Sequence, residues 1–533
     1  MNNYKDFYLK ITKNKKYFLF FVFIISVLAA IPAFNSNTYI NCDLTFHLHR
    51  IEEISQNLSM GIFLPSIQNN NIFGMGYLVD IFYPNLFLYI PALFFLFTKN
   101  IILSFSLFII VYNIFTFFLC YNYLKNIKGE KIAFYFSVIY ILFPYRLMNL
   151  YINGFVGEFL ACSFLPLVIF GLEKIFEENK YKEFVLGMVG VLYCHTISLL
   201  LCAIYVFIYC LFNIKKILKN FKILLDLIKS TILTFIIGSG FLLPFIDNMK
   251  DLSYKYNINA DKSGILAYGL FDLNVGIEIL IQLSLIVFLV SFYKRKKSKN
   301  ISFLYSLICV YGIIMITKIF PWELFDYIPF LRNIQFSLRI LPFIFVFAIY
   351  LISELCCDLK DMNKSIILLC VSFVFFTSNI KMAMSNNECF KYKEENGTYL
   401  DIVGGEYLPS SFVLDELTLD IFNICFDNSD DVIDYKINKN NREITLEIDT
   451  KEKVDVSIPK IYYKNYNVYD SNNKLIPKYE NNGLLYLKNI GTGIYYIRYE
   501  ISNIQIISLF ISIISFIIFI SIYFKQKINN NKS

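Results

Sequence analysis

The feature that most limits the fold of this chain is a series of long apolar runs separated by short basic loops. Runs rich in Leu, Ile and Phe recur between residues 17 and 524. About 20 consecutive apolar residues suffice to cross a bilayer as a helix, whereas a soluble domain has little room for many runs of that length. The composition agrees, because 56% of the residues are hydrophobic and only 17% are charged. The sequence therefore predicts an α-helical polytopic membrane protein.

Basic residues predict the side of the membrane on which each loop lies, because lysine and arginine are enriched in cytoplasmic loops. The predicted cytoplasmic loops are 125–131, 173–183 (of mixed charge), 215–229, 293–300, 356–364 and 525–532. The predicted extracytoplasmic loops, which contain fewer basic residues, are 35–80, 146–157, 247–272, 318–335 and 381–502. We expect an uncleaved first helix at 17–34 and cytoplasmic N- and C-termini. The net charge of +7 is spread over these loops, so we expect no nucleic-acid partner.

Hydropathy and loop placement together predict about twelve helices, some of them short or re-entrant. Besides 17–34 and 101–124, the expected spans are 132–145, 158–172, 228–246, 275–293, 301–317, 337–355, 364–380 and 503–524. Segment 81–97 contains Pro84 and Pro91, so we expect a broken or re-entrant hairpin there. Segment 184–212 must enter and leave the membrane but is too short for two full spans. Two short helices are therefore expected to meet near His195.

The chain changes character after the predicted span that ends at residue 380. Alternating apolar and polar residues predict strands at 443–449, 454–463, 484–490 and 494–501, with a turn at Asn481-Asn482-Gly483. The predicted domains are a transmembrane domain at 1–380, whose outer loop 35–80 bears the site, and an extracytoplasmic β-sandwich-like domain at 381–502. A final transmembrane helix at 503–524 and a cytoplasmic tail at 525–533 complete the chain.

A polar cluster in the first outer loop is the leading candidate for chemistry. Asp43, His47, His49 and Arg50 lie within ten residues, and the segment 44–59 has a helical pattern. On such a helix His47 and Arg50 share the face of Asp43, whereas His49 does not, and Glu52 and Glu53 are expected on the solvated side. Asp43 is then either the N-cap of the helix or a base or metal ligand. The two roles do not exclude each other.

Further ionisable residues are expected near the outer membrane face, where such residues are functional candidates by default. Glu158 opens an apolar helix, so it either stabilises the helix dipole or belongs to a site. Arg146 and Arg339 either anchor the membrane interface or bind phosphate oxygens, and Arg332 lies one loop away from Arg339. His195 is either a satisfied core histidine or a site residue.

Several common nucleotide and metal motifs do not occur in the sequence. It contains no Walker A loop, no GxGxxG, no HExxH and no Asp-x-Asp pair typical of nucleotide-sugar sites. A soluble nucleotide donor bound from the cytoplasm is therefore not supported.

Short motifs spread over most of the chain resemble one family of bacterial polytopic membrane proteins. They are Asp43-x3-His47 with Arg50, Gly61-x3-Pro65, Phe73-Gly-Met-Gly-Tyr77, Phe82-Tyr-Pro84, Asn153-Gly154-x2-Gly157-Glu158, Gln335-Phe-Ser-Leu-Arg339 and Gly405-Glu-Tyr-Leu-Pro409. The family is labelled 6-pyruvoyl-tetrahydropterin synthase related and is similar to GT-C glycosyltransferases and to YfhO-like proteins. Two departures stand out: Asn153 replaces an arginine of the family pattern, and Ser337-Leu338 replaces a Pro-Trp pair. The pterin-synthase label itself implies a soluble zinc-binding fold with clustered histidines, which these residues do not support.

The resemblance implies a GT-C architecture with a lipid-phosphate sugar donor. On this model Asp43 is the general base that activates an acceptor hydroxyl, and Arg339 or Arg146 neutralises the departing polyprenyl phosphate. Glu158 and His195 are expected to position the acceptor or to hold a divalent metal ion. His47 and Arg50 are expected to assist substrate binding. The partners are then the membrane, a lipid-linked sugar donor and a cell-envelope acceptor.

Two other classes of function remain open at the level of sequence. A transporter or flippase for lipid or polysaccharide predicts paired internal repeats and charges in the middle of several helices, and no repeat is evident. A non-catalytic scaffold predicts that only the outer domain contacts the cell envelope.

Overall fold

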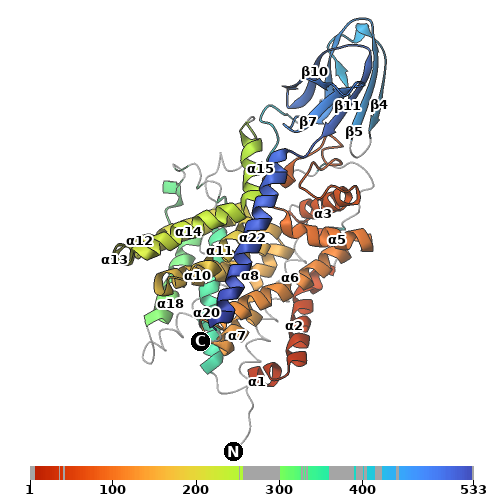
Figure 1. The fold of residues 1–533 in the computed structure, drawn as a ribbon. Coiled ribbons are helices and arrows are strands. Elements are labelled where there is room, and N and C mark those ends of the chain that lie inside the picture. The colour runs from red at the N-terminus through yellow and green to blue at the C-terminus, as the bar shows by residue number, and fades with distance from the viewer. Residues whose placement is uncertain are drawn as a thin grey trace, which may run out of the picture. The chain divides into compact units, whose positions relative to one another are not determined.

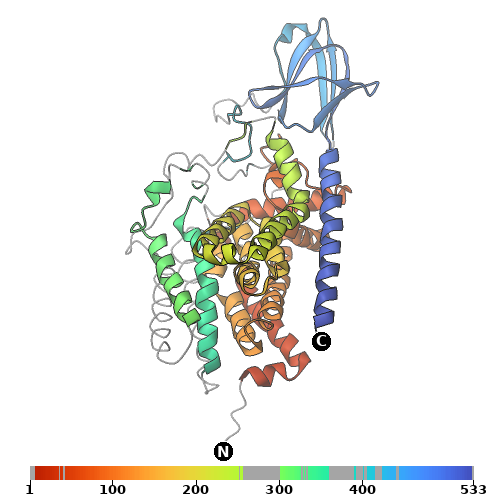
Figure 2. The ribbon, with the colours of Figure 1, turned by 60° about the vertical axis from the view of Figure 1, so that its left-hand side comes forward.

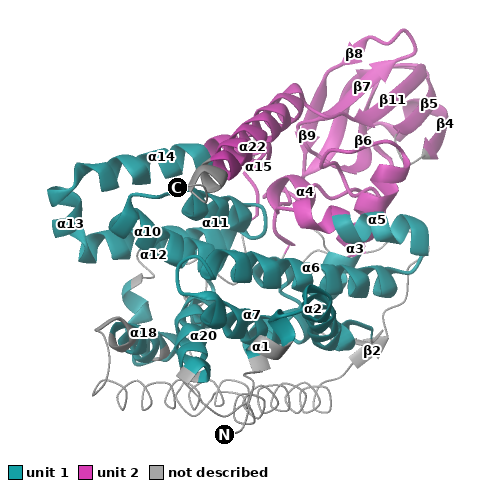
Figure 3. Cartoon of the chain, turned by 60° about the horizontal axis from the view of Figure 1, so that its bottom comes forward, with its two compact units in different colours: residues 1–48, 90–234, 260–392 teal, residues 49–89, 235–259, 393–533 magenta. Residues whose placement is uncertain are grey.

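The structure is a computed structural model that places side chains along most of the chain. It describes residues 7–34, 37–39, 43–250, 253–255, 300–325, 328, 331, 334–358, 389–391, 400, 405–413, 423–439 and 443–530. The chain divides into two compact units, which Figure 3 shows in different colours. Unit 1 comprises residues 1–48, 90–234 and 260–392, and unit 2 comprises residues 49–89, 235–259 and 393–533.

Unit 1 is built almost entirely of helices (Figure 1). Its described α-helices, including two whose ends extend into unit 2, are α1 (Phe7–Thr12), α2 (Lys15–Ala30), α5 (Tyr89–Thr98), α6 (Ile101–Leu124), α7 (Glu130–Leu142), α8 (Pro144–Tyr151), α9 (Val156–Cys162), α10 (Leu165–Glu178), α11 (Lys182–Leu192), α12 (Thr196–Phe212), α13 (Ile214–Lys219), α14 (Phe221–Ile237), α18 (Asn300–Ile316) and α20 (Leu341–Asp358). Short 3-10 helices lie at η1 (Ile31–Phe34), η3 (Trp322–Phe325) and η4 (Ser337–Ile340), and β1 (Asn37–Tyr39) pairs with β2 (Cys389–Lys391).

Six helical segments of the described residues are long and apolar enough to cross a membrane. They are Lys15–Phe34, Ile101–Leu124, Glu130–Tyr151, Val156–Glu178, Ser337–Glu354 and Asn503–Lys525. These segments confirm the predicted polytopic membrane protein. The expected spans 275–293 and 364–380 lie outside the described residues.

Helix α7 forms the centre of unit 1. After Glu130 and Lys131 it is almost entirely apolar, and every residue from Ala133 to Leu142 is buried. It packs against α6 on one side and α20 on another, while α10 packs against α11. A helix that is hydrophobic all round must be enclosed by other helices or by lipid, and here other helices enclose it.

Proline positions divide two of the expected spans. The expected span 158–172 lies within the candidate span Val156–Glu178, but its helix is interrupted, because α9 ends at Cys162 and α10 begins at Leu165. Pro166 has no N–H to donate to the carbonyl of Cys162, so the helix cannot continue through this point. Pro144 acts similarly: Phe143 before it is extended, which ends α7 at Leu142 rather than at residue 145.

Both predicted irregular segments are confirmed. The stretch 81–97 is divided into α4 (Val79–Phe82), η2 (Leu86–Leu88) and α5, and Tyr83 before Pro84 is extended. Helices α11 and α12 are short and meet at His195, which is the N-cap residue of α12.

Unit 2 contains an antiparallel β domain. The four-stranded sheet has the order β3-β6-β10-β9 and the five-stranded sheet the order β4-β5-β11-β7-β8. The strands are β3 (Cys425–Phe426), β4 (Val432–Lys439), β5 (Glu443–Thr450), β6 (Val454–Ile461), β7 (Tyr466–Asp470), β8 (Leu475–Ile476), β9 (Lys478–Asn481), β10 (Leu484–Ile490) and β11 (Gly493–Tyr499). The four predicted strands are therefore present, and β3, β4, β7, β8 and β9 were not foreseen.

Alternation of side chains gives strand β5 one buried face. In β5 the side chains of Ile444, Leu446 and Ile448 are buried, while the residues between them are more exposed. The predicted turn at residues 481–483 joins β9 to β10. Asn482 and Gly483 have φ values of 50° and 78°. These positive angles are what a two-residue hairpin turn requires.

The β domain belongs to the same compact unit as helices α15 (Ser239–Met249) and α22 (Asn503–Asn530). Helix α22 follows the last strand and runs beside α15 (Figure 2), and the Ser239 hydroxyl donates to the carbonyl of Ser508 in α22. The first-loop segment is also held here, because the Lys460 ammonium donates to the carbonyl of Gly74 at 2.7 Å. Unit 2 thus combines three stretches that are far apart in sequence.

Candidate functional site

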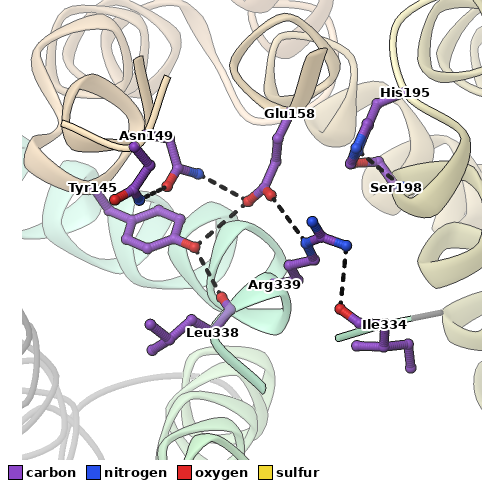
Figure 4. A network of polar contacts seen from close by, with 9 residues as sticks. Tyr145, Asn149, Glu158, His195, Ser198, Ile334, Leu338 and Arg339 are labelled. Carbon is purple, nitrogen blue, oxygen red and sulfur yellow. Dashed lines mark hydrogen bonds and ion pairs between the residues drawn. The ribbon is translucent and has the colours of Figure 1, made fainter. Parts of the chain in front are cut away.

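Glu158 lies at the centre of a buried polar network in unit 1. It sits in the first turn of α9 and is 3% exposed. Its Oε1 atom accepts a hydrogen bond from the Asn149 side chain at 2.8 Å and a longer one from the Tyr145 hydroxyl at 3.5 Å (Figure 4). Tyr145 and Asn149 are four residues apart on α8 and therefore share one helix face. Helix α8 thus presents two donors to one carboxylate oxygen.

Arg339 faces the other oxygen of this carboxylate. The Nε atom of Arg339 is 3.8 Å from Oε2 of Glu158. That distance is too long for a hydrogen bond, and neither atom has another hydrogen-bond partner although both are buried. The Arg339 Nη1 atom donates to the carbonyl of Ile334 at 3.2 Å. Arg339 and Glu158 therefore form an ion pair in which the two facing atoms, Nε and Oε2, are not hydrogen-bonded to each other.

The η4 segment that carries Arg339 is fixed by its neighbours. The Ser337 hydroxyl donates to the carbonyl of Ile316 at the end of α18, and the Leu338 carbonyl accepts from Tyr145 at 2.9 Å. The guanidinium of Arg339 lies over the rings of Phe155 and Phe336, at 5.8 and 5.4 Å from their centroids. Every residue from Phe336 to Arg339 therefore makes a defined contact in this site or beside it.

Asn153 connects this network to Asp43. Its side chain donates to Asn149 at 3.1 Å, and its carbonyl accepts from the backbone N–H of Asp43 at 3.2 Å. Gly154, with φ +70°, allows this approach, because a Cβ there would lie 2.3 Å from the backbone nitrogen of Leu44. Asn153 therefore ties Asp43, which directly precedes α3, to the Glu158 network.

Asp43 lies at the N-cap position, which is one of the two roles that the sequence left open. It directly precedes α3 (Leu44–Ser59), is partly exposed, and its carbonyl accepts from the backbone of His47 at 3.2 Å. This position leaves open a chemical role for the carboxylate.

In the view of Figure 4, His195 lies on the side of Arg339 that is away from Glu158. Its Nδ1 atom accepts from the backbone N–H of Ser198 at 3.3 Å and lies 2.8 Å from the Ser198 hydroxyl. Arg339 acts electrostatically on the His195 ring. The hydrogen bonds to Ser198 fit the interpretation of His195 as a structural residue. Because His195 also lies near Arg339, it remains a candidate site residue.

Arg146 lies apart from the Glu158 network. Its guanidinium donates to Asn113 at 2.9 Å and to Thr116 at 3.4 Å, both on α6, and stacks on Phe159 at 4.0 Å. It is only 3% exposed, so the alternative that it anchors the membrane interface by snorkelling was wrong.

The remaining predicted residues of the first loop are buried. His47 is 2% exposed and packs edge-on against Phe46. Arg50, which is 1% exposed, pairs with Asp80 at 2.9 Å and also donates to the carbonyl of Tyr83 at 2.9 Å. These contacts fix the break after α4, and Arg50 belongs to unit 2.

The sequence also singled out Glu53, His49 and Arg332. The prediction that Glu53 is solvated was wrong, because its carboxylate accepts the backbone N–H groups of Asn69 and Asn70 and is 2% exposed. The helix therefore buries more of its surface than an amphipathic pattern implies. His49, also buried, is 8% exposed. Arg332 lies outside the described residues.

Sequence reasoning missed Tyr145 and Asn149, and it singled out Asn153 only as a departure from the family pattern. Their spacing of four residues was the available signal, because it aligns polar side chains along one face of an otherwise apolar helix. Among the described residues, no group of three or more His, Cys, Asp or Glu side chains is placed to hold a metal ion. The neighbours of Glu158 are instead amide, hydroxyl and guanidinium groups.

Comparison with known proteins places the helical part of the chain in one group. A family model described as "6-pyruvoyl-tetrahydropterin synthase related domain; membrane protein" matches residues 81–385, more than half of the chain. An uncharacterized protein of Lactococcus lactis subsp. cremoris (strain MG1363) is 27% identical over 340 residues. The match covers 58% of this chain and 55% of that relative, so the chain spans about half of the relative's length.

Proposed function

This chain belongs to the 6-pyruvoyl-tetrahydropterin synthase related family of membrane proteins, and from that membership we propose that it is a glycosyltransferase of GT-C type. It moves a sugar from a polyprenyl-phosphate donor to an extracytoplasmic acceptor of the cell envelope. The family description names only a membrane protein, so the proposal depends on the site.

The environment of Arg339 is the observation that carries the proposal. The residue is 8% exposed, and in the described part of the chain its guanidinium makes one hydrogen bond, to Ile334. A guanidinium has five N–H donors in a planar fork that suits phosphate oxygens. A buried arginine with unused donors favours an anionic ligand, and a donor that arrives through the lipid phase brings its own phosphate.

Asp43 acts as the general base in this scheme. Its carboxylate takes the proton from an acceptor hydroxyl as that oxygen forms a bond to the anomeric carbon. The bond between the anomeric carbon and the phosphate oxygen breaks, and the polyprenyl phosphate leaves with the electron pair. Arg339 stabilises the charge that develops on this leaving group. The Asn153–Asp43 backbone contact supports the pairing of these two roles in one site.

The other residues have supporting roles. Glu158 and His195 position the acceptor, because both lie beside Arg339. Arg146 holds α8 against α6, and through α8 it orients Tyr145 and Asn149. Arg50 stabilises the chain break after α4 and does not need to touch substrate.

Sugar transfer in reconstituted membranes tests the proposal. The purified chain is given a labelled polyprenyl-phosphate sugar and a cell-envelope extract as acceptor. We expect Asp43→Asn to reduce the turnover rate by about 100-fold or more, the usual effect of losing a general base. Asp434→Asn, the same change on an exposed residue of β4, is the matched control and keeps full activity.

Two results would count against this function. Equal transfer by the wild type and Asp43→Asn removes Asp43 from the mechanism. Movement of the intact labelled lipid between leaflets without any sugar transfer would show that the protein acts as a transporter and not as a glycosyltransferase.

A further inference from the structure

We infer that Glu158 is a displaceable counterion: it occupies the anion position beside Arg339 until the phosphate group of a polyprenyl lipid takes its place. This inference rests on the proposed function, because it describes how the same site accepts its donor. It assigns to Glu158 a role in controlling donor affinity in addition to positioning the acceptor.

The open geometry of the pair is the first argument. Charged hydrogen bonds between a guanidinium and a carboxylate normally have N···O distances of about 2.7–2.9 Å. Here the distance is 3.8 Å, and the Arg339 Nε and Glu158 Oε2 atoms lack any hydrogen bond. Burying both groups while leaving this bond unmade is costly. The two side chains neutralise each other's charge but do not form the direct guanidinium–carboxylate hydrogen bond, which would be their strongest interaction.

Separate anchoring of the two side chains is the second argument. Asn149 and Tyr145 hold Glu158 by its far oxygen Oε1. Ile334 and two aromatic rings hold Arg339. Neither set of anchors includes the other member of the pair. The electrostatic contact can therefore be replaced without loss of the hydrogen bonds that place each group.

The unused edge of the guanidinium is the third argument. No hydrogen bond joins the Nη2 atom of Arg339 to any residue that the structure describes, and the side chain retains 9% exposure, against 3% for Glu158. Arg339 is thus the more accessible partner. A phosphate oxygen can bind at Nη2 and Nε together, which is the fork geometry that guanidinium groups offer to oxyanions.

Exchange of one anion for another follows from these three observations. When phosphate binds, the charge of Arg339 is balanced by the ligand, and Oε2 of Glu158 becomes available to accept a hydrogen bond from a sugar hydroxyl. Before phosphate binds, the negative charge of Glu158 competes with it. The charge of Glu158 therefore lowers donor affinity, and its removal raises it.

Binding of polyprenyl monophosphate to the full chain in lipid nanodiscs tests the exchange. Glu158→Gln keeps an acceptor for Asn149 and removes the charge, so we expect it to bind at least about fivefold more tightly than the wild type. Arg339→Gln is expected to lose binding. Glu173→Gln is the matched control: Glu173 pairs with Tyr305 at 2.6 Å and with Lys128 instead, so affinity should not change. Polyprenol and inorganic phosphate, given separately, distinguish recognition of the lipid phosphate from binding of the chain or of free phosphate.

An infrared difference spectrum gives a second measurement on the wild type, which decides the question even if Glu158→Gln does not fold. Polyprenyl phosphate should change a carboxylate stretching band of the wild type, and where Glu158→Gln folds, that change should be absent from its spectrum. Equal affinity of the wild type and Glu158→Gln for polyprenyl phosphate, or binding without a change in the carboxylate band, would overturn the inference that Glu158 is a displaceable counterion. If neither binds polyprenyl phosphate, the proposed function fails with it. If the protein transfers sugar but its affinity for polyprenyl phosphate is the same with and without the charge of Glu158, only this inference fails.

Discussion

At the scale of single residues, the site depends on close approaches that only particular residues allow. Gly154 allows the backbone of Asp43 to come within hydrogen-bond distance of Asn153. Asn149 and Asn153 then carry the connection to Glu158 through their side-chain amides. None of these groups is charged, which is why a search for ionisable residues in the sequence passes over them. The carboxylates and arginines were predictable, but the amides that hold them together were not.

Substitution of Gly154 tests this connection. We expect Gly154→Ala to lower the melting temperature of the purified chain, because its Cβ would lie 2.3 Å from the backbone nitrogen of Leu44. Gly129→Ala is the control in the same unit: Gly129 also has a positive φ, of +92°, but no atom lies within 4 Å of its Cβ position. Both variants carry a backbone cost of about 1–2 kcal/mol. Equal melting temperatures of the two would show that the close approach to Leu44 contributes nothing.

At the scale of elements, proline positions made the helix breaks predictable in part. The break after α4 and the short helices on either side of His195 were expected from Pro84 and from the length of segment 184–212. The division between α9 and α10 follows from Pro166 by the same physics, yet the apolar run around it concealed the break. Strand β9 was missed because its side chains are mostly exposed and polar, which removes the alternating pattern.

Lys478 on β9 gives the β domain a titration that can be measured. Burial lowers its pKa from 10.5 to about 8, while Glu500 raises it; the ammonium donates to the carbonyl of Lys464. The folded domain therefore holds fewer protons than the unfolded chain between pH 8 and 10.5. The charged form costs stability below pH 8, and this cost falls as the pH rises through that window.

Acylation of lysines, followed by mass spectrometry, measures this pKa, because only the neutral amine reacts. We expect Lys478 to reach half of its maximal rate near pH 8 in the folded chain. In the urea-unfolded chain the same residue should do so near the ordinary lysine value of about 10.4. Identical midpoints in the two states would contradict the burial of the ammonium.

At the scale of the whole molecule, the predicted membrane protein with a β domain is confirmed, but its division into compact units was not foreseen. Residues 49–89 and 235–259 join residues 393–533, whereas the sequence suggested a boundary near residue 380. Hydropathy and periodicity are local properties. They identify elements, and they carry no information on which distant segments pack together. For this reason the helices and four strands were predictable and the units were not.

The orientation of the chain in the membrane remains a prediction that tagging can test. The hairpin between β7 and β8 ends in an exposed turn at Asn472 and Asn473, so an epitope inserted there should not disturb the sheets. We expect an antibody to reach this epitope on intact protoplasts. A tag after Ser533 should be reached only after permeabilisation. The opposite pattern would invert the topology, and with it the side on which Asp43 meets its acceptor.

The three-part construction of unit 2 also has a consequence for biosynthesis. Residues 49–89 leave the ribosome long before residues 393–533, with which they share a compact unit. At typical translation rates this delay is on the order of tens of seconds. During that time Arg50 and Asp80 can already pair, whereas Gly74 must wait for Lys460 and α15 must wait for α22. The nascent chain therefore passes through a stage in which its first loop and α15 lack their final partners.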